Sequence, residues 1–439
     1  MSLRAMRGLS LDQAPPLSVV LPFFVAGALS AAAAGGLLAA DGSAALTMPL
    51  APTTLGATHL ITIGLLMLVM MGALYPMIPV VLGVPVPWIR LSHGVFVMVG
   101  AGVGLLVAGL TNSRADLVAA AMVGLGLGVA CFLPPAAWAA FRSPAKTPTA
   151  WGIRFALLSL AAVVLLGLLM ARGHAGSVFP GDRWLFVRVH VALGVLGWIG
   201  SLIVAVSWQV VPMFYLAKEV PGWQRYSVLG ALVLGVGLPP LGLLLAPWLG
   251  SALTEAAVTY GASPALFALF VAHPWVTLKS IRDRRRKRAH PSVLFFRCGL
   301  ATAPLVGGAA ILASISDEPR WDLLYGFLAL VGWAAMIVHG MLSRIVPFLV
   351  WFHRFSPLAG LQPIPSMNAL LPARWTRVGL GLHAGAVGLG AVGILTGHDF
   401  AMRGAGALLA GTGLSLAAMI VHVALQRPAS PAANLDLGS

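Results

Sequence analysis

Charged residues are scarce in this chain, and acidic residues are the scarcest of all. Only 9% of its 439 residues are Asp, Glu, Lys or Arg, and 12 of these are acidic, whereas 59% of the chain is hydrophobic and the mean hydropathy is +0.93. In ordinary soluble domains about a quarter of the residues are charged. The composition therefore excludes a soluble globular protein and indicates a polytopic membrane protein.

Cysteine is also nearly absent, and no nucleotide-binding motif is present. Cys131 and Cys298 lie alone in apolar stretches, which excludes a disulfide framework and a cysteine-based metal motif. The glycines lie within apolar runs such as residues 122–130 and not in a strand-to-helix phosphate loop, so they indicate close helix packing. Nothing in the sequence indicates nucleic-acid binding.

Long apolar runs are what the sequence has in abundance. About 20 apolar residues in a helix cross the roughly 30 Å of hydrocarbon in a bilayer. We predict an all-α membrane protein in which residues 1–426 form a single transmembrane domain and residues 427–439 form a flexible cytoplasmic tail. The first run has no obvious cleavage site, so we expect it to be retained as a span. The twelve predicted helices are 17–40, 56–83, 89–110, 115–140, 150–171, 185–217, 226–248, 252–276, 292–314, 322–352, 376–396 and 400–425.

The basic residues predict the orientation of these helices. With the N-terminus inside, twenty of the 27 Lys and Arg residues fall on the cytoplasmic side and six on the other, while most acidic residues fall outside. This asymmetry follows the positive-inside rule, and it accounts for most of the net charge of +15. We therefore expect a multi-pass protein of a bacterial-type inner membrane with both termini in the cytoplasm.

The densest basic segment is the run 279–290 between the eighth and ninth predicted helices. Its simpler interpretation is a cytoplasmic loop that fixes the topology. The alternative is a docking site for anionic lipid or for an acidic partner.

Three segments resemble one another and predict an internal repeat. They are residues 72–83, 205–217 and 340–352, and alignment superimposes Pro79, Pro212 and Pro347, which are 133 and 135 residues apart. Each interval covers four predicted helices. The chain is therefore predicted to consist of three pseudo-repeated four-helix units in the same orientation.

The resemblance extends toward the outer ends of the same three helices. His59 precedes its proline by 20 residues, and His190 and Tyr325 precede theirs by 22 residues. At 1.5 Å per residue, each side chain lies roughly 30 Å from its proline. The three positions are thus predicted to share one depth near the outer face, and His59 and His190 are the strongest candidate ligands for haem b or copper.

Twelve helices, a threefold repeat and histidines at the outer ends of helices two and six resemble the subunit I superfamily of haem-copper oxidases. They are also similar to the NnrS-type haem- and copper-containing membrane proteins. The resemblance covers nearly the whole chain in topology, although its motifs are short. It implies that His59 corresponds to an axial ligand of a low-spin haem and His190 to a copper ligand.

The sequence departs from that family at several ligands. Residues 226–248, the seventh helix, contain no histidine, and the tenth helix carries Tyr325 and Phe327 where the family has histidines. His339 lies fourteen residues further on, about 21 Å deeper. We therefore expect no complete oxygen-reducing centre. The absence of Asp and Glu from the apolar cores also argues against proton pumping.

Other polar residues within the spans are weaker candidates. His93, His339, His383 and His422 lie deeper or toward the cytoplasm, and each alone is more often a packing or hydrogen-bonding residue. Five further histidines fall in loops or at helix ends and are expected to be solvated surface residues: His174, His273, His290, His353 and His398. Arg344 is predicted to reach the cytoplasmic headgroups, or alternatively to pair with a haem propionate or a quinone oxygen.

Three hypotheses of function remain open at this point. The first is a haem- or copper-binding protein of electron transfer, respiratory or nitric-oxide-related chemistry, with Tyr325, His339 and Arg344 as further cofactor-binding candidates. The second is a cofactor-free membrane subunit or small-solute carrier. The third is a degenerate membrane oxidoreductase completed by a cytochrome c or another redox subunit in a homo- or hetero-oligomer.

Overall fold

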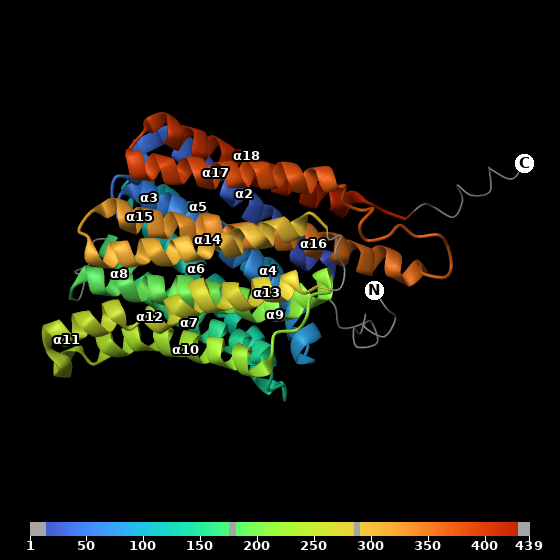
Figure 1. The fold of residues 1–439 in the computed structure, drawn as a ribbon, viewed down its shortest axis with the longest axis horizontal. Coiled ribbons are helices and arrows are strands. Elements are labelled where there is room, and N and C mark those ends of the chain that lie inside the picture. Colours follow the sequence, from blue (N-terminus) through green and yellow to red (C-terminus); the bar gives the residue numbers. More distant parts are fainter. Residues whose placement is uncertain (1–14, 175–180, 285–289, 429–439) are drawn as a thin grey trace, which may run out of the picture.

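The computed structural model describes residues 15–174, 181–284 and 290–428, and these residues form a bundle of long helices (Figure 1). No strand occurs within these ranges. Most of the tail predicted at 427–439 lies outside the described residues. The first span begins and the last span ends at the same end of the bundle, which we call the terminus end, and the opposite end is called the outer end.

The first six spans are four helices without a π-helical segment and two helices that contain one. The elements are α2 (Leu17–Asp41), α3 (Pro52–His59), η3 (Leu60–Met67), α4 (Leu68–Leu82), α5 (Leu91–Thr111), α6 (Ala115–Arg142), α7 (Pro148–His174), α8 (Arg183–Val191), η4 (Ala192–Gly200) and α9 (Ser201–Tyr215).

The remaining elements complete the bundle in the same way. They are α10 (Gly222–Leu244), α11 (Ala246–Tyr260), α12 (Ser263–Phe267), η5 (Ala268–Ala272), α13 (His273–Arg282), α14 (Ser292–Ile315), α15 (Pro319–Phe327), η6 (Leu328–Ala335), α16 (Met336–Val350), η7 (Trp351–Phe355), α17 (Ala373–Thr396) and α18 (Asp399–Leu425). Short 3₁₀ turns follow α2, at Gly42–Leu46, and η7, at Ser356–Leu358.

The prediction of twelve membrane-spanning helices is confirmed. The described residues contain twelve continuous helical stretches that are long and apolar enough to cross a bilayer, and each overlaps one predicted helix. The largest boundary difference concerns the eighth span, predicted at 252–276, which the structure extends to Ala246–Arg282. This stretch bends at Gly250, whose φ of 73° lies in the left-handed region that glycine adopts without steric cost.

The three helices that carry the aligned prolines form the centre of the bundle. The apolar windows of Pro52–Leu82, Arg183–Tyr215 and Pro319–Leu358 are 72%, 78% and 83% buried, whereas those of the other nine spans are 28–44% buried. Because helices at the periphery turn one face to lipid, only central helices can bury most of their surface. The sequence repeat thus marks the core of the molecule.

Each central helix contains a π-helical segment at the same distance from its proline. The segments η3, η4 and η6 all end twelve residues before the aligned proline, and η6 touches both of the others. A π-helix bonds i to i+5, so it widens the helix and leaves carbonyls free for other partners. The three wide segments therefore meet in the interior.

The packing against these segments also recurs. Gly64, Gly197 and Gly332 each precede the aligned proline by fifteen residues. A methyl group on them would approach Ser30, Ser159 and Thr302 to 2.6, 2.7 and 2.8 Å, respectively. These hydroxyl residues lie on α2, α7 and α14, each the helix before a central one. One helix pair of each predicted unit thus packs alike, whereas the repeat of whole four-helix units stays a prediction.

Candidate functional site

His59 and His190 lie at the outer ends of two neighbouring central helices. His59 is the last residue of α3, directly before η3, and His190 is the penultimate residue of α8, two residues before η4. The two imidazoles are within electrostatic range of one another. These two side chains, which were predicted to share a depth, therefore also lie near one another. We call their location the outer histidine site.

The hydrogen bonding of His59 determines its tautomer. Its Nδ1 lies 2.7 Å from the carbonyl oxygen of Leu55, one helical turn earlier, and a carbonyl can only accept. The proton of the neutral ring is therefore on Nδ1, and Nε2 carries the free lone pair. A ligating histidine commonly has this arrangement, in which the second nitrogen is held by a backbone carbonyl.

The ring of His190 packs tightly against α7 and keeps one nitrogen without a partner. A methyl group on Gly167 would come within 3.0 Å of its Cε1, a tight contact, so this glycine gives the imidazole room. Its Nδ1 is buried and has no hydrogen-bond partner within the described residues. Since a buried polar atom without a partner is unfavourable, this nitrogen is available for a ligand.

Two other residues belong to the same end of the bundle. His174, which we expected to be a solvated surface residue, ends α7 within electrostatic range of His59, and its Nε2 accepts a hydrogen bond of 2.7 Å from Arg183. Tyr325 occupies the corresponding position in the third central helix, half-buried, with Asp322 as its charged neighbour. The repeat pattern predicted the location of Tyr325, but no motif in the sequence pointed to His174.

Among the deeper histidines, only His339 and His383 come together. Their Nδ1 atoms are 3.3 Å apart, and the ring of Phe295 covers His339 with a centroid distance of 4.3 Å. His383 Nε2 donates to the carbonyl of Val331 at 3.0 Å, within η6. His383 Nδ1 must then accept from His339, so each ring satisfies the other in a buried pair between α16 and α17.

The other histidines do not join a site. His93 is exposed on α5. His422 stacks on Trp375 at 5.6 Å and accepts a hydrogen bond from Gln426. The expectation that His273 is a surface residue is wrong, because it is completely buried and its Nε2 lies 2.9 Å from Ser207 Oγ.

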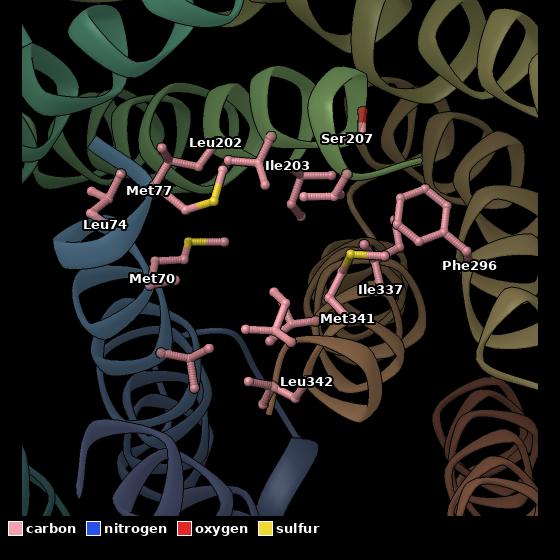
Figure 2. Close-up of a pocket in the computed structure, with 16 residues that line it drawn as sticks. Met70, Leu74, Met77, Leu202, Ile203, Ser207, Phe296, Ile337, Met341 and Leu342 are labelled. Atoms are coloured by element: carbon pink, nitrogen blue, oxygen red, sulfur yellow. The ribbon is translucent and has the colours of Figure 1, made fainter. Parts of the chain in front are cut away.

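A small apolar cavity lies between the three central helices, and Figure 2 shows side chains that line it. Most of its lining residues belong to the half of each central helix nearer the terminus end. Its volume is about 80 Å³, and its lining is apolar except for Ser207. Met70 and Met77 of α4 point into it, and Met341 of α16 lies across from them. Met70 follows His59 by eleven residues, so the cavity begins about 16 Å below the outer histidine site.

Arg344 is buried at the terminus end and does not extend along the surface. It is only 6% exposed, and its Nη1 donates to Asn368 Oδ1 at 2.7 Å, in the loop before α17. The expected reach to the headgroups is therefore replaced by a position beneath this loop. Arg344 follows Tyr325 by nineteen residues, about 28 Å, so it cannot contact a group bound at the outer histidine site.

The fold defines this chain as a polytopic helical membrane protein that contacts the lipid bilayer. It matches no known protein family, and no curated protein is significantly similar to it.

Proposed function

We propose that the protein binds haem b at the outer histidine site and acts in electron transfer or in respiratory or nitric-oxide-related chemistry. The observation that carries this proposal is a pair of nearby imidazoles that each keep a free ring nitrogen: His59 has a free Nε2 because its Nδ1 is bonded to Leu55, and His190 has a buried Nδ1 without a partner among the described residues. The resemblance of the topology to subunit I of haem-copper oxidases supports the same assignment.

The donor set favours haem over copper. Protein-bound copper and zinc usually have three or more side-chain ligands. Within the described residues, no group of three or more His, Cys, Asp and Glu side chains could hold a metal ion. A haem iron needs only one or two axial ligands because the porphyrin supplies four nitrogens. When bound, haem b would supply one-electron chemistry, and the chain itself would hold and orient it through the two imidazoles.

Optical spectra of the purified protein test the proposal. After expression with added haem precursor, the wild type should show a Soret band, a spectral change on reduction with dithionite, and a pyridine-haemochrome signal. We expect His59→Ala and His190→Ala each to lose or alter these signals. His93→Ala is the matched control, since this exposed histidine lies on α5, away from the site.

Two results would contradict the haem proposal. One is a folded wild-type protein without a Soret band after growth with added haem precursor. The other is an unchanged spectrum in both outer-histidine variants. A measured stoichiometric copper content that is lost in His190→Ala would instead favour copper at this site.

The central cavity favours a second candidate function, the passage or binding of a small apolar solute by a cofactor-free protein. Apolar cavities of this kind stay dry and take up apolar molecules. In that case, His59→Ala would leave uptake of the solute unchanged, whereas Met341→Trp would fill the cavity and block this uptake. Uptake into proteoliposomes, compared between the two variants, separates the two functions.

The proposed setting is a bacterial inner membrane with the terminus end in the cytoplasm. The basic loops support this orientation through the positive-inside rule. A cytochrome c or another redox subunit would then supply electrons from the other side, and its co-purification with the wild type would identify it.

A further inference from the structure

Arg344 is one of two deeply buried arginines within the described residues, and the two differ in how they are satisfied. Arg154 is 5% exposed and donates to the carbonyl oxygens of Ala140 and Ser143 at 2.9 and 2.7 Å, which end the helix α6. Arg344 is 6% exposed, but its Nε is buried without a partner. Helix-end carbonyls thus accept hydrogen bonds from one buried guanidinium, whereas the other guanidinium is incompletely hydrogen-bonded.

Among the described residues, no carboxylate pairs with Arg344. None of the ion pairs in the described part of the chain includes it. Its guanidinium carbon lies 5.5 Å from the ring centroid of Phe214, and the neutral amide of Asn368 is its only hydrogen-bond acceptor in the part of the chain that the structure describes. A buried charge without a counter-charge is strongly unfavourable, so the position calls for an anion.

Polar residues that are linked by hydrogen bonds lie near this guanidinium. Tyr215 donates to Ser292 Oγ at 3.2 Å, and the Ser292 side chain and backbone N–H both lie against His290 Nδ1, at 3.1 and 3.2 Å. Nδ1 of His290 is therefore an acceptor, and Nε2 of the neutral ring bears the proton. Tyr215 and His290 both lie within electrostatic range of Arg344.

The loop before α17 closes over this group and is held in place at two points. Trp351 Nε1 donates to the carbonyl of Pro365 at 2.9 Å, and Gln426 Nε2 donates to the carbonyl of Leu370 at 2.9 Å. Asn368, which contacts Arg344, lies between these two anchors and is itself exposed. The site is thus built from two central helices, at α16 and at the end of α9, from the start of α14, and from an anchored loop that faces water. We call the residues Tyr215, His290, Ser292, Arg344 and Asn368 the Arg344 cluster.

We propose that the Arg344 cluster binds a phosphate group at the terminus end of the bundle. Phosphate oxygens accept charge-assisted hydrogen bonds from guanidinium and imidazole N–H groups, and their negative charge would offset the positive charge of Arg344. The group belongs either to a small phosphorylated solute or free phosphate, or to the headgroup of a phospholipid. The site is separate from the outer histidine site, so it does not depend on haem binding.

Thermal unfolding of the intact protein tests the proposal. The protein is purified in a detergent without phosphate, in chloride buffer, and the unfolding temperature is measured against added inorganic phosphate with chloride at equal ionic strength as reference. We expect phosphate to raise the unfolding temperature of the wild type. Arg344→Gln should weaken phosphate binding about ten- to hundredfold, since it removes charged hydrogen bonds.

Arg154→Gln is the matched control, because it removes an equally buried arginine that already has its partners. It should lower the unfolding temperature and keep the response to phosphate. If Arg344→Gln does not fold, Arg344→Lys retains the charge without the planar set of donors, and equilibrium dialysis of the wild type with radiolabelled phosphate measures binding directly.

Bound phosphorus distinguishes the two sources. A wild-type protein that retains a stoichiometric anionic phospholipid after delipidation, and loses it in Arg344→Lys, supports the lipid headgroup. A response to inorganic phosphate without retained lipid supports the solute. The proposal is overturned if the wild type responds to phosphate no more than to chloride and retains no phosphorus, or if the Arg344 variants respond as the wild type does.

Discussion

At the residue scale, the histidines show what a side chain's position in the sequence reveals. His59 and His190 were predicted to share a depth, and they do so because depth along a helix is a count of residues. His273 was expected at the surface because it lies near the end of an apolar run, yet the structure buries it completely against Ser207. Its burial depends on the rotation of the eighth span toward α9, which the local sequence does not encode.

His290 leads to a prediction at this scale about pH. Burial and the nearby Arg344 lower the pKa of His290 from 6.5 to about 4. Between pH 6.5 and about 4, His290 therefore binds a proton in the unfolded state but stays neutral in the folded state. The contribution of this residue to the free energy of unfolding should be constant above pH 6.5 and should decrease as the pH falls from 6.5 toward 4.

Unfolding temperatures measured between pH 7.5 and pH 4.5 test this expectation. The decrease should be less steep in His290→Asn than in the wild type, since asparagine does not titrate. His398→Asn, which replaces an exposed histidine, should follow the wild type. Equal slopes in all three proteins would show that His290 does not contribute.

At the element scale, the membrane-spanning helices were predictable from the sequence, whereas the π-helical segments within them were not. Hydropathy located all twelve spans, and repeated prolines identified the three helices that prove to be central. The wide turns of η3, η4 and η6 coincide with glycines that face Ser30, Ser159 and Thr302 on neighbouring helices. The π-helical segments thus coincide with contacts between neighbouring helices. A short stretch of sequence does not reveal these contacts.

Close packing between the first and last spans leads to a prediction at this scale. A methyl group on Gly413 of α18 would collide with the backbone of Ala32 and the carbonyl of Ala28 on α2, whereas one on Gly36 of α2 would meet nothing within 4 Å. Small residues of this kind let membrane helices approach closely. We expect Gly413→Ala to destabilise the protein by about 1–3 kcal/mol, the usual range for overpacking.

Gly36→Ala is the control, and it should leave the unfolding temperature unchanged or raise it slightly because alanine favours helix. Both variants can be compared in one detergent by thermal unfolding. If Gly413→Ala were as stable as Gly36→Ala, the close approach of α2 and α18 would not be needed for stability.

At the scale of the whole molecule, the first span begins and the last span ends at one end of the bundle, and the basic residues predict that this end faces the cytoplasm. Labelling of single cysteines tests this assignment in a background in which Cys131 and Cys298 are replaced by alanine. Lys146→Cys lies between α6 and α7 at the terminus end, and Asp317→Cys lies between α14 and α15 at the outer end.

A membrane-impermeant maleimide should label Asp317→Cys in intact spheroplasts and Lys146→Cys only after lysis. Labelling of both sites after lysis provides the control for accessibility. The opposite pattern would reverse the orientation, and it would place the Arg344 cluster on the side away from the cytoplasm.

The sequence alone determined the class of protein, its twelve spans, the spacing of the three aligned prolines and the depth of His59 and His190, because hydropathy and residue spacing are properties of local sequence. The tertiary structure placed the helices that carry these prolines at the centre of the bundle. The tertiary structure decided which side chains meet: it paired His339 with His383, buried His273, and enclosed Arg344 beneath an anchored loop. These outcomes depend on how each helix is rotated against neighbours far away in the chain, and that rotation is set by packing.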